Sequence, residues 1–318
     1  MKTFLVAWLL LCASTVGHCC DVCGIYLGIQ PNDRASSISL MYRYRRLEGD
    51  LRVGGVPTAQ PKHGGHGAAP AVARNIHYKE LYQVAELRAD VWLTDRFAVL
   101  VSIPMVNNYQ ATDGYARSDV YGLGDPLFIA RYLVANTKCK ATDDRVVHRF
   151  MVGAGAKVPL GSTKAQYNNA EVPMDLQPGT GTWDALASLE YKMRFRKNGL
   201  GISMIGRYNT VNSNDARLGH GLSTTAEYFH QFNFGENWKF APSLGAYHEL
   251  YGMDAGNGES LDGTGSSTLF AHVGTRVWWR SWGISANFQY AVLHDLGALM
   301  VPNRERFVAG ITYNLIKS

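Results

Sequence analysis

The sequence has few charges and no long apolar run in its body. Asp, Glu, Lys and Arg make up 18% of its 318 residues, below the roughly 25% of a typical soluble domain. No stretch beyond the N-terminal segment approaches the ~18 uninterrupted apolar residues of a membrane-spanning helix. The formal charge of +5 comes without a Lys/Arg block, so we expect no nucleic-acid partner.

The sequence also lacks the short motifs of common enzyme sites. It contains no G-x-S-x-G, and no Ser, His and Asp stand at a spacing that indicates a catalytic triad. The glycine-rich stretch Gly122-Leu123-Gly124-Asp125-Pro126 has no Lys-Ser/Thr after it and opens no helical pattern, so it is not a phosphate loop. We therefore expect no enzyme activity and no cofactor.

The N-terminus has the features of an export signal. Lys2 precedes an apolar run at residues 4–12, which is too short to span a bilayer, and small residues follow up to Gly17. We predict cleavage near Gly17 or His18, so that residues 1–18 are removed. Lipidation at Cys19 is the alternative, but it is disfavoured because His18 precedes this cysteine where a lipoprotein has a small residue.

A period of two dominates the rest of the chain. In residues 181–196 the odd positions from Trp183 to Phe195 are all apolar, whereas most even positions are charged or polar. Alternate side chains of a strand point to opposite faces, so one face is apolar and the other polar. The pattern runs for ~14 residues, longer than a usual soluble strand and long enough for a tilted membrane strand.

The same alternation predicts about twelve strands between residues 36 and 318. They are expected at 37–47, 81–93, 97–105, 126–134, 150–160, 181–196, 200–208, 222–232, 238–250, 269–279, 284–292 and 307–315. The strand at 126–134 is the least certain, because both of its faces are apolar. The fold class is therefore all-β, and the architecture a transmembrane antiparallel up-and-down β-barrel of about 12 strands.

The connections alternate in length, as they do in outer-membrane barrels. Long ones are expected at 48–76, 109–119, 161–180, 209–220, 252–266 and 294–305. Those between them are short or, at 135–145, intermediate. Long outer loops and short periplasmic turns place both termini in the periplasm of a Gram-negative bacterium. A secreted soluble β-sandwich also alternates apolar and polar residues, but strand length and loop alternation favour the barrel.

Four cysteines remain after signal cleavage, at Cys19, Cys20, Cys23 and Cys139. The three near the N-terminus lie in residues 19–35, a periplasmic or plug segment, and Cys139 lies in a connection expected on the same side. An oxidising periplasm favours disulfides among these four. The C-x-x-C of Cys20 and Cys23 is also a weak candidate for metal or thiol chemistry.

Two histidines in the first long loop are a second weak candidate for metal binding. His63 and His66 stand in a glycine-rich stretch of residues 62–67, and no third ligand is evident nearby. A solvated loop without metal explains the same residues.

The charged residues of the strands fall on the polar face, which we expect to line the interior of the barrel. The expected pore-lining residues are Arg43, Arg45, Glu86, Arg88, Asp90, Arg149, Lys157, Asp184, Glu190, Lys192, Arg194, Arg207, Glu227, Lys239, Glu249, Arg276 and Arg280. Such charges either set the ion preference of an open pore or pair with one another and fill a closed lumen. Basic residues outnumber acidic ones, so an open pore is predicted to prefer anions.

Two motifs resemble a known family. The stretches 122–126 and 178–184, each followed by a strand, resemble the outer-membrane transporter family first named for the meta-pathway of phenol degradation. That family includes the pore that secretes functional amyloid, although this chain lacks the long N-terminal extension of that pore. Cys20-Asp21-Val22-Cys23-Gly24 resembles a transporter subgroup. The resemblance implies a barrel of about twelve strands that transports an undetermined solute or polypeptide.

The sequence thus predicts an outer-membrane channel or transporter for an undetermined small solute, embedded in the lipid bilayer. The alternative is a barrel that transports nothing and acts as a scaffold or surface-interaction protein, possibly linked to a metal. The sequence does not indicate an oligomeric state.

Overall fold

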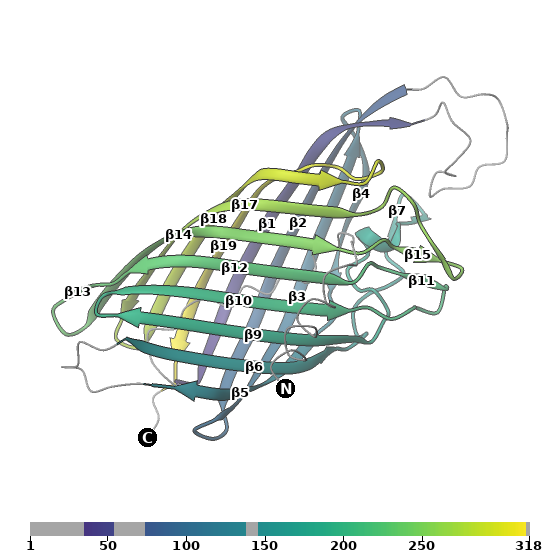
Figure 1. Ribbon diagram of the computed structural model, residues 1–318. Coiled ribbons are helices and arrows are strands. Elements are labelled where there is room, and N and C mark those ends of the chain that lie inside the picture. Colours follow the sequence, from purple (N-terminus) through teal and green to yellow (C-terminus); the bar gives the residue numbers. More distant parts are fainter. Residues whose placement is uncertain (1–34, 54–73, 138–145, 316–318) are drawn as a thin grey trace, which may run out of the picture.

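Twelve long antiparallel strands form one closed barrel in the computed structural model, which describes residues 35–53, 74–137 and 146–315 (Figure 1). The barrel strands are β1 (Ser37–Val53), β2 (Arg74–Trp92), β3 (Phe97–Thr112), β5 (Leu127–Asn136), β6 (Val147–Lys157), β9 (Asp184–Phe195), β10 (Asn198–Tyr208), β12 (Gly221–His230), β14 (Trp238–Tyr251), β17 (Ser266–Trp279), β18 (Trp282–Leu296) and β19 (Asn303–Asn314).

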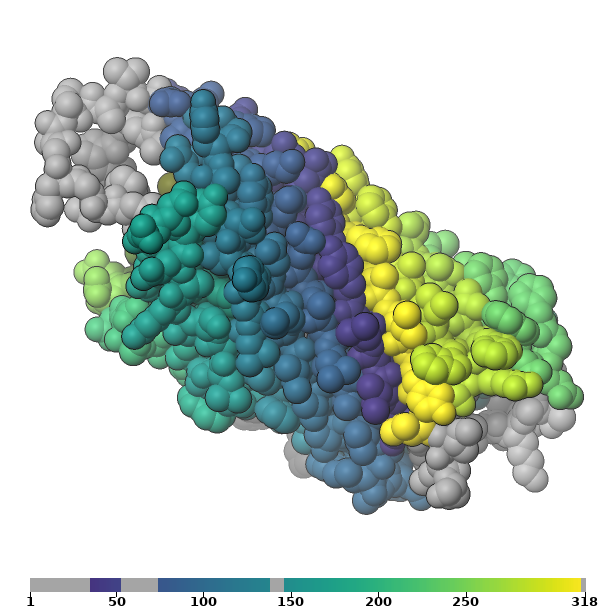
Figure 2. Space-filling view, turned by 180° about the vertical axis from the view of Figure 1, so that it is seen from behind, coloured from purple at the N-terminus to yellow at the C-terminus, as the bar shows by residue number. Residues whose placement is uncertain are grey.

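The barrel closes between its first and last strands. β1 pairs with β19 from Ser37 opposite Asn314 to Leu47 opposite Asn303. Figure 2 shows this seam, with the purple N-terminal strand lying along the yellow C-terminal strand. Each of the other barrel strands pairs with its neighbours in the chain, including β12 with β14. The predicted twelve-stranded up-and-down barrel is confirmed.

Alternation along each strand separates an outer apolar face from an inner, largely polar one. On β1, Leu40 is 59% exposed whereas Ser39 is 6% exposed. β5 is largely apolar on both faces, apart from Arg131, because its inner residues Leu127 and Ile129 pack with Leu100, Leu186 and Ile205 inside the barrel. This inner apolar cluster explains why the alternation at 126–134 is weak.

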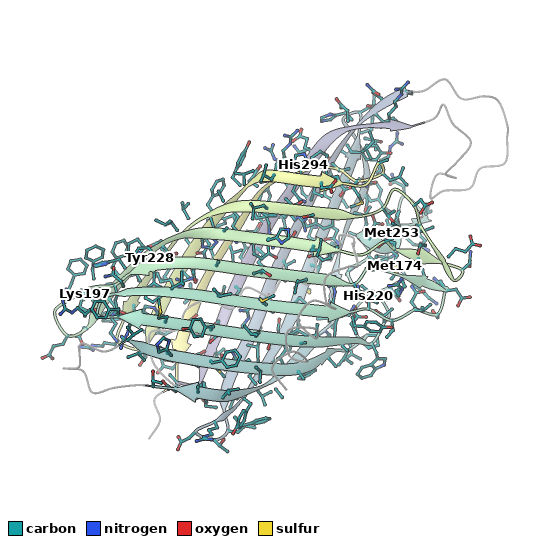
Figure 3. The ribbon with its side chains drawn as sticks, viewed as in Figure 1. Met174, Lys197, His220, Tyr228, Met253 and His294 are labelled. Carbon is teal, nitrogen blue, oxygen red and sulfur yellow. The ribbon has the colours of Figure 1, made fainter. Side chains whose placement is uncertain are left out.

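One end of the barrel carries the short connections. Tight turns join the strands there, with Arg196 and Arg280 in the left-handed region at φ 53° and 52°. The described ends of the chain meet at this end, where the Leu315 amide donates to the Ser36 carbonyl at 2.7 Å. In Figure 3, Lys197 and Tyr228 mark this end, and Met174, His220 and Met253 mark the opposite end.

The other end carries the long connections, which contain short elements of their own. These are β4 (Tyr115–Leu123), β7 (Gln166–Tyr167), β8 (Ala170–Glu171), the 3-10 helix η2 (Met174–Leu176), β11 (Ala216–Arg217), β15 (Ala255–Gly256) and β16 (Glu259–Ser260). A further short strand, β13 (Phe232–Phe234), extends the β12–β14 connection at the short-connection end. Within the described ranges, no helix has the length and apolarity to cross a membrane.

The expected long loop at 109–119 is a hairpin, which corrects the sequence interpretation. β3 continues to Thr112 and pairs with β4, and Asp113 and Gly114 form the turn. Both turn residues have positive φ, 50° and 82°, which is the geometry that Asp-Gly favours in a two-residue hairpin. β1 and β2 likewise extend beyond their predicted limits, to Val53 and from Arg74.

Candidate functional site

The inward-facing residues of β2 show how the barrel wall changes along the barrel axis. From the long-connection end inward, its inner positions are Glu80, Tyr82, Val84, Glu86, Arg88 and Asp90. Successive inner positions lie about 6.6 Å apart along a strand. Along β2 the interior face therefore changes from mixed residues at the mouth, through apolar Val84, to charged residues below it.

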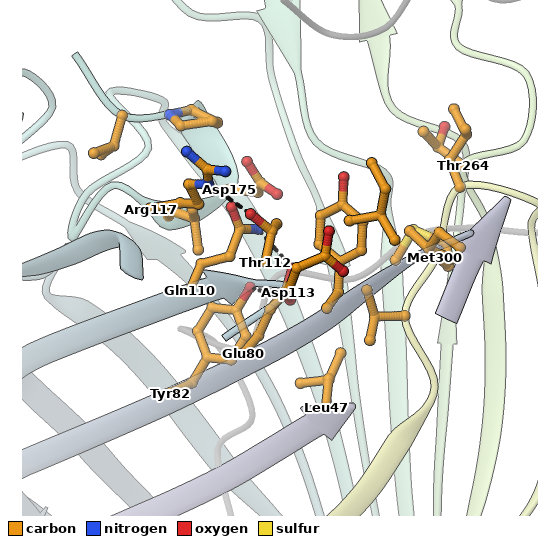
Figure 4. A pocket seen from close by; sticks show the side chains of 18 of the residues that line it. Leu47, Glu80, Tyr82, Gln110, Thr112, Asp113, Arg117, Asp175, Thr264 and Met300 are labelled. Carbon is orange, nitrogen blue, oxygen red and sulfur yellow. Dashed lines mark hydrogen bonds between the residues drawn. The ribbon is translucent and has the colours of Figure 1, made fainter. Parts of the chain in front are cut away.

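A pocket of about 600 Å³ lies at the mouth, and we call it the mouth pocket. Its walls come from β1, β2 and β3, Arg117 on β4, the β6–β9 connection at residues 158–183, Thr264 in the β14–β17 connection, and the β18–β19 connection (Figure 4). The residues that matter to the argument are Leu47, Glu80, Tyr82, Gln110, Leu176 and Leu299.

A buried carboxylate, Glu80, lies on the polar side of the mouth pocket, whose lining also includes Arg45 and Arg117. Glu80 accepts hydrogen bonds from the Tyr82 hydroxyl at 3.0 Å and from the Gln110 amide at 2.8 Å. Nearby, the Arg117 guanidinium donates to the Thr112 hydroxyl at 2.6 Å. These contacts fix the side chains before any solute arrives, which lowers the entropy cost of binding.

The rim of the mouth pocket also carries charge. The Asp113 carboxylate accepts from the His77 backbone amide at 3.0 Å and from Arg74 at 2.8 Å. The His77 amide, and then the charge of Arg74, hold the pKa of Asp113 below its ordinary value despite partial desolvation. Asp113 is therefore anionic at neutral pH.

The apolar side of the mouth pocket belongs to a buried cluster. Leu47 and Tyr82 from the barrel wall pack with Val172 and Leu176 from the β6–β9 connection and with Val301 from the β18–β19 connection. Two loops that are distant in sequence thus fold inward onto the wall. The pocket combines an apolar body with a polar edge, as small-molecule sites do.

The β6–β9 connection is pinned to the barrel by what we call the Lys157 cluster: Lys157, Asp125, Asp184, Thr180 and Thr182. The Lys157 ammonium lies 3.2 Å from Asp125 and 2.5 Å from Asp184, and it also contacts Thr180. Asp125 accepts from the Thr180 amide and hydroxyl, both at 2.8 Å. All five side chains are buried, so the two carboxylates depend on the lysine for charge compensation.

Glycines allow the same connection to approach the barrel closely. A Cβ on Gly179 would lie 2.6 Å from the carbonyl carbon of Gly161, and one on Gly161 would lie 2.8 Å from Asp125 Oδ1. The Gly161 amide donates to that Asp125 oxygen at 2.9 Å. The two stretches 122–126 and 178–184 therefore meet in space, and the buried lysine joins them.

The structure places most of the seventeen expected pore-lining residues in the interior. Eleven are buried: Arg43, Arg45, Glu86, Arg88, Lys157, Asp184, Glu190, Arg207, Glu227, Glu249 and Arg276. Asp90, Arg149, Lys192 and Lys239 are half-buried. Arg194, near the end of β9, and Arg280, in the β17–β18 turn, are exposed instead.

Some of the interior charges pair over two or more strands, whereas Glu86 pairs within its own strand, β2, and with the next strand, β1. Arg45 on β1 and Arg306 on β19 both bind Glu249 on β14, with Arg45 at 3.1 Å. Arg276 on β17 binds Glu227 on β12 at 2.9 Å. Glu86 binds Arg88 at 2.7 Å and Arg43 at 3.3 Å. These ion pairs occupy part of the lumen.

Sequence reasoning missed several interior residues. Asp125 was read only as part of a motif without a phosphate site, although an aspartate just before a strand is a candidate for the inner face. Arg131 binds Asp90 at 2.5 Å, and its odd position on β5 could have indicated its inward direction. Glu80 and Arg306 fall just outside the predicted strand limits.

The sulfur and histidine candidates lie outside the described residues. These are Cys19, Cys20, Cys23, Cys139, His63 and His66. Among the residues with described positions, no group of three or more His, Cys, Asp or Glu side chains could hold a metal ion.

Comparisons with known proteins give structural likeness only. No sequence family matches the chain, and neither does any curated protein. The crystal structure of the COG4313 outer membrane channel from Pseudomonas putida F1 is similar, with a TM-score of 0.61 and 14% identity over 91% of this chain and all of that one. The β domain of the Bordetella autotransporter BrkA aligns over 88% of this chain and 99% of its own, at a TM-score of 0.45 and 14% identity.

At this identity the likeness establishes a fold and no more. The chain has the closed twelve-stranded barrel architecture seen in an outer-membrane channel. The resemblance to the family named for phenol degradation stays a prediction, because no sequence family matches.

Proposed function

We propose that this protein is an outer-membrane channel for a small solute that has an apolar body and a polar group, and that the mouth pocket is the first site where the solute binds. The observation that carries the proposal is the pocket itself. It holds about 600 Å³ between barrel wall and inward loops, with a fixed carboxylate on one side and an apolar cluster on the other.

The outward face of the barrel supports a membrane location. It is apolar at Leu40, Leu244, Val273 and Ile284, each exposed by more than half, which is costly in water and favourable in lipid. Aromatic pairs follow this face at the short-connection end, including Trp238 with Trp279 and Trp282 with Tyr313. Such residues sit at the bilayer interface. With the short turns periplasmic, the mouth pocket faces the outside of the cell.

A flux assay tests the channel proposal. Proteoliposomes should admit phenyl β-glucoside, which joins a ring to a polar head, faster than they admit glucose. Leu299→Asp places a charge in the pocket lining, where Leu299 is 40% exposed, and should remove most of that preference. Leu261→Asp is the matched control, since Leu261 is 37% exposed on a neighbouring connection and does not line the pocket.

The alternative, a scaffold or surface-interaction barrel that transports nothing, draws support from the ion pairs that cross the lumen at Glu249. It predicts that wild-type proteoliposomes admit neither solute above the rate of empty liposomes. If both solutes enter at the same rate and Leu299→Asp changes neither rate, the protein is a channel but the mouth pocket is not its solute-binding site.

A further inference from the structure

An apolar layer lies directly below the mouth pocket. Val84 on β2 and Val106 on β3 pack with Leu218 from the β10–β12 connection and with Met174 from η2. We call these four residues the apolar constriction. No charged side chain belongs to this cluster, although buried charges lie next to it, with Glu86 only two residues from Val84.

The connection that carries Leu218 reaches from the β10–β12 side of the barrel to the β2–β3 wall. Around the ring of twelve strands, β2 is reached from β12 through β10, β9, β6, β5 and β3, so six steps separate the two strands in either direction. Leu218 lies three residues before β12 begins, yet its side chain packs against the opposite wall, which β2 and β3 form. Its connection therefore crosses the interior.

Buried polar side chains hold both inward segments in place. The Asn209 amide donates to the carbonyls of Leu218 and Gly219 at 3.2 and 2.6 Å, and Asp254 accepts from the Gly219 amide at 2.9 Å. On the other side, the Asn108 amide donates to the Leu176 carbonyl at 3.0 Å. These buried hydrogen bonds tie both inward segments to the barrel wall or to a neighbouring connection and so favour a defined geometry.

The two segments also contact each other. The Asn212 amide lies 3.4 Å from the Met174 sulfur, so the β10–β12 connection and η2 meet where Leu218 and Met174 pack. An apolar layer of this kind disfavours water and ions, because neither finds hydrogen-bond partners there.

We propose that the apolar constriction of Val84, Val106, Met174 and Leu218 is the selectivity filter of this barrel, which excludes ions and passes solutes with an uncharged apolar body. The inference rests on the proposed function, because it names the solute property that the channel selects. Long flexible Met174 adapts to a passing solute better than a branched residue does. The interior charges below the filter do not produce ion conductance, because ions must first cross the apolar constriction.

Ion conductance in planar bilayers tests the filter, using full-length protein processed and purified from outer membranes. Wild type should conduct weakly in KCl. Leu218→Ser and Met174→Ser should each raise the conductance roughly tenfold, which corresponds to about 1.4 kcal/mol of barrier. The matched control is Val211→Ser, because Val211 lies on the same connection, is 55% exposed and does not belong to the cluster.

Two further measurements keep the outcomes separate. Heat-modifiable migration on a gel shows whether each variant is folded. If Leu218→Ser does not fold, Met174→Ser still tests the filter, because Met174 is only half-buried and its substitution disturbs the fold less. If Leu218→Ser and Met174→Ser are both folded and conduct no better than wild type, the filter proposal is overturned. The phenyl β-glucoside flux reports on the channel proposal independently, since the filter variants should keep it.

Discussion

Replacing Lys157 with methionine should destabilise the barrel more than any other single change of a lysine in the described residues. The ammonium is the cation between the buried carboxylates of Asp125 and Asp184, at 3.2 and 2.5 Å. Removing one partner of a buried ion pair costs about 3–5 kcal/mol, because the opposite charge stays buried without compensation. Methionine has a similar length and keeps most of the packing, so the loss is electrostatic.

The assay is urea unfolding of the folded protein in phospholipid bicelles, followed by tryptophan fluorescence. Trp183 stands in the sequence between two members of the Lys157 cluster, Thr182 and Asp184, and contributes to a signal that follows unfolding of the whole barrel. The matched control is Lys164→Met, because Lys164 is exposed in the same connection, where substitutions change stability by about 0.5 kcal/mol or less.

A double change separates charge from packing. Asp184→Asn in the Lys157→Met background removes one of the two uncompensated carboxylates, so it should recover part of the lost free energy of unfolding. The same substitution in the wild-type background should destabilise instead, and the difference between the two is the coupling energy. A Lys157→Met variant as stable as Lys164→Met, or a double variant with strictly additive losses, refutes the reasoning.

Three further predictions follow from single features of the structure. Gly179→Ala should destabilise the barrel in the same urea assay and Gly206→Ala should not, because the new Cβ meets backbone 2.6 Å away at Gly179 and nothing within 4 Å at Gly206. Burial, and then the charge of Arg217, lower the pKa of His220. The stability this supplies is present above about pH 6.5 and lost as pH falls, so proteolysis at residues 209–220 should increase on acidification, and not in His220→Gln. Once Leu218→Ser conducts, its reversal potential in a KCl gradient should show anion preference, and cation preference contradicts the predicted excess of basic lining residues.

The sequence by itself determined the strands and their order. Each strand has one face toward an apolar environment and one toward the interior, so apolar and polar residues alternate along its sequence with a period of two. Ser37 and Phe97 begin strands where the alternation places them. The hairpin at Asp113-Gly114 could also have been predicted, since this dipeptide between alternating residues is a strong local hairpin signal. The sequence pattern instead predicted a loop there, because the surrounding residues are polar.

The tertiary structure alone decided what fills the barrel. Asp125 and Thr180 are 55 residues apart, and Lys157 comes from a different strand, so no local pattern predicts that they meet. The same holds for Arg45 and Glu249, which become partners only when the first strand closes against the last. Alternation assigned these charges to the inner face but could not choose their partners.

The site depends on the direction in which the loops fold. Leu218 stands in a polar connection, and its sequence neighbourhood resembles that of any solvent-exposed loop. Its inward position follows from the hydrogen bonds of Asn209 and Asp254 and from the apolar wall at Val84. Local sequence specifies a strand through its two faces, whereas a loop takes its direction from surfaces that exist only after the barrel has closed.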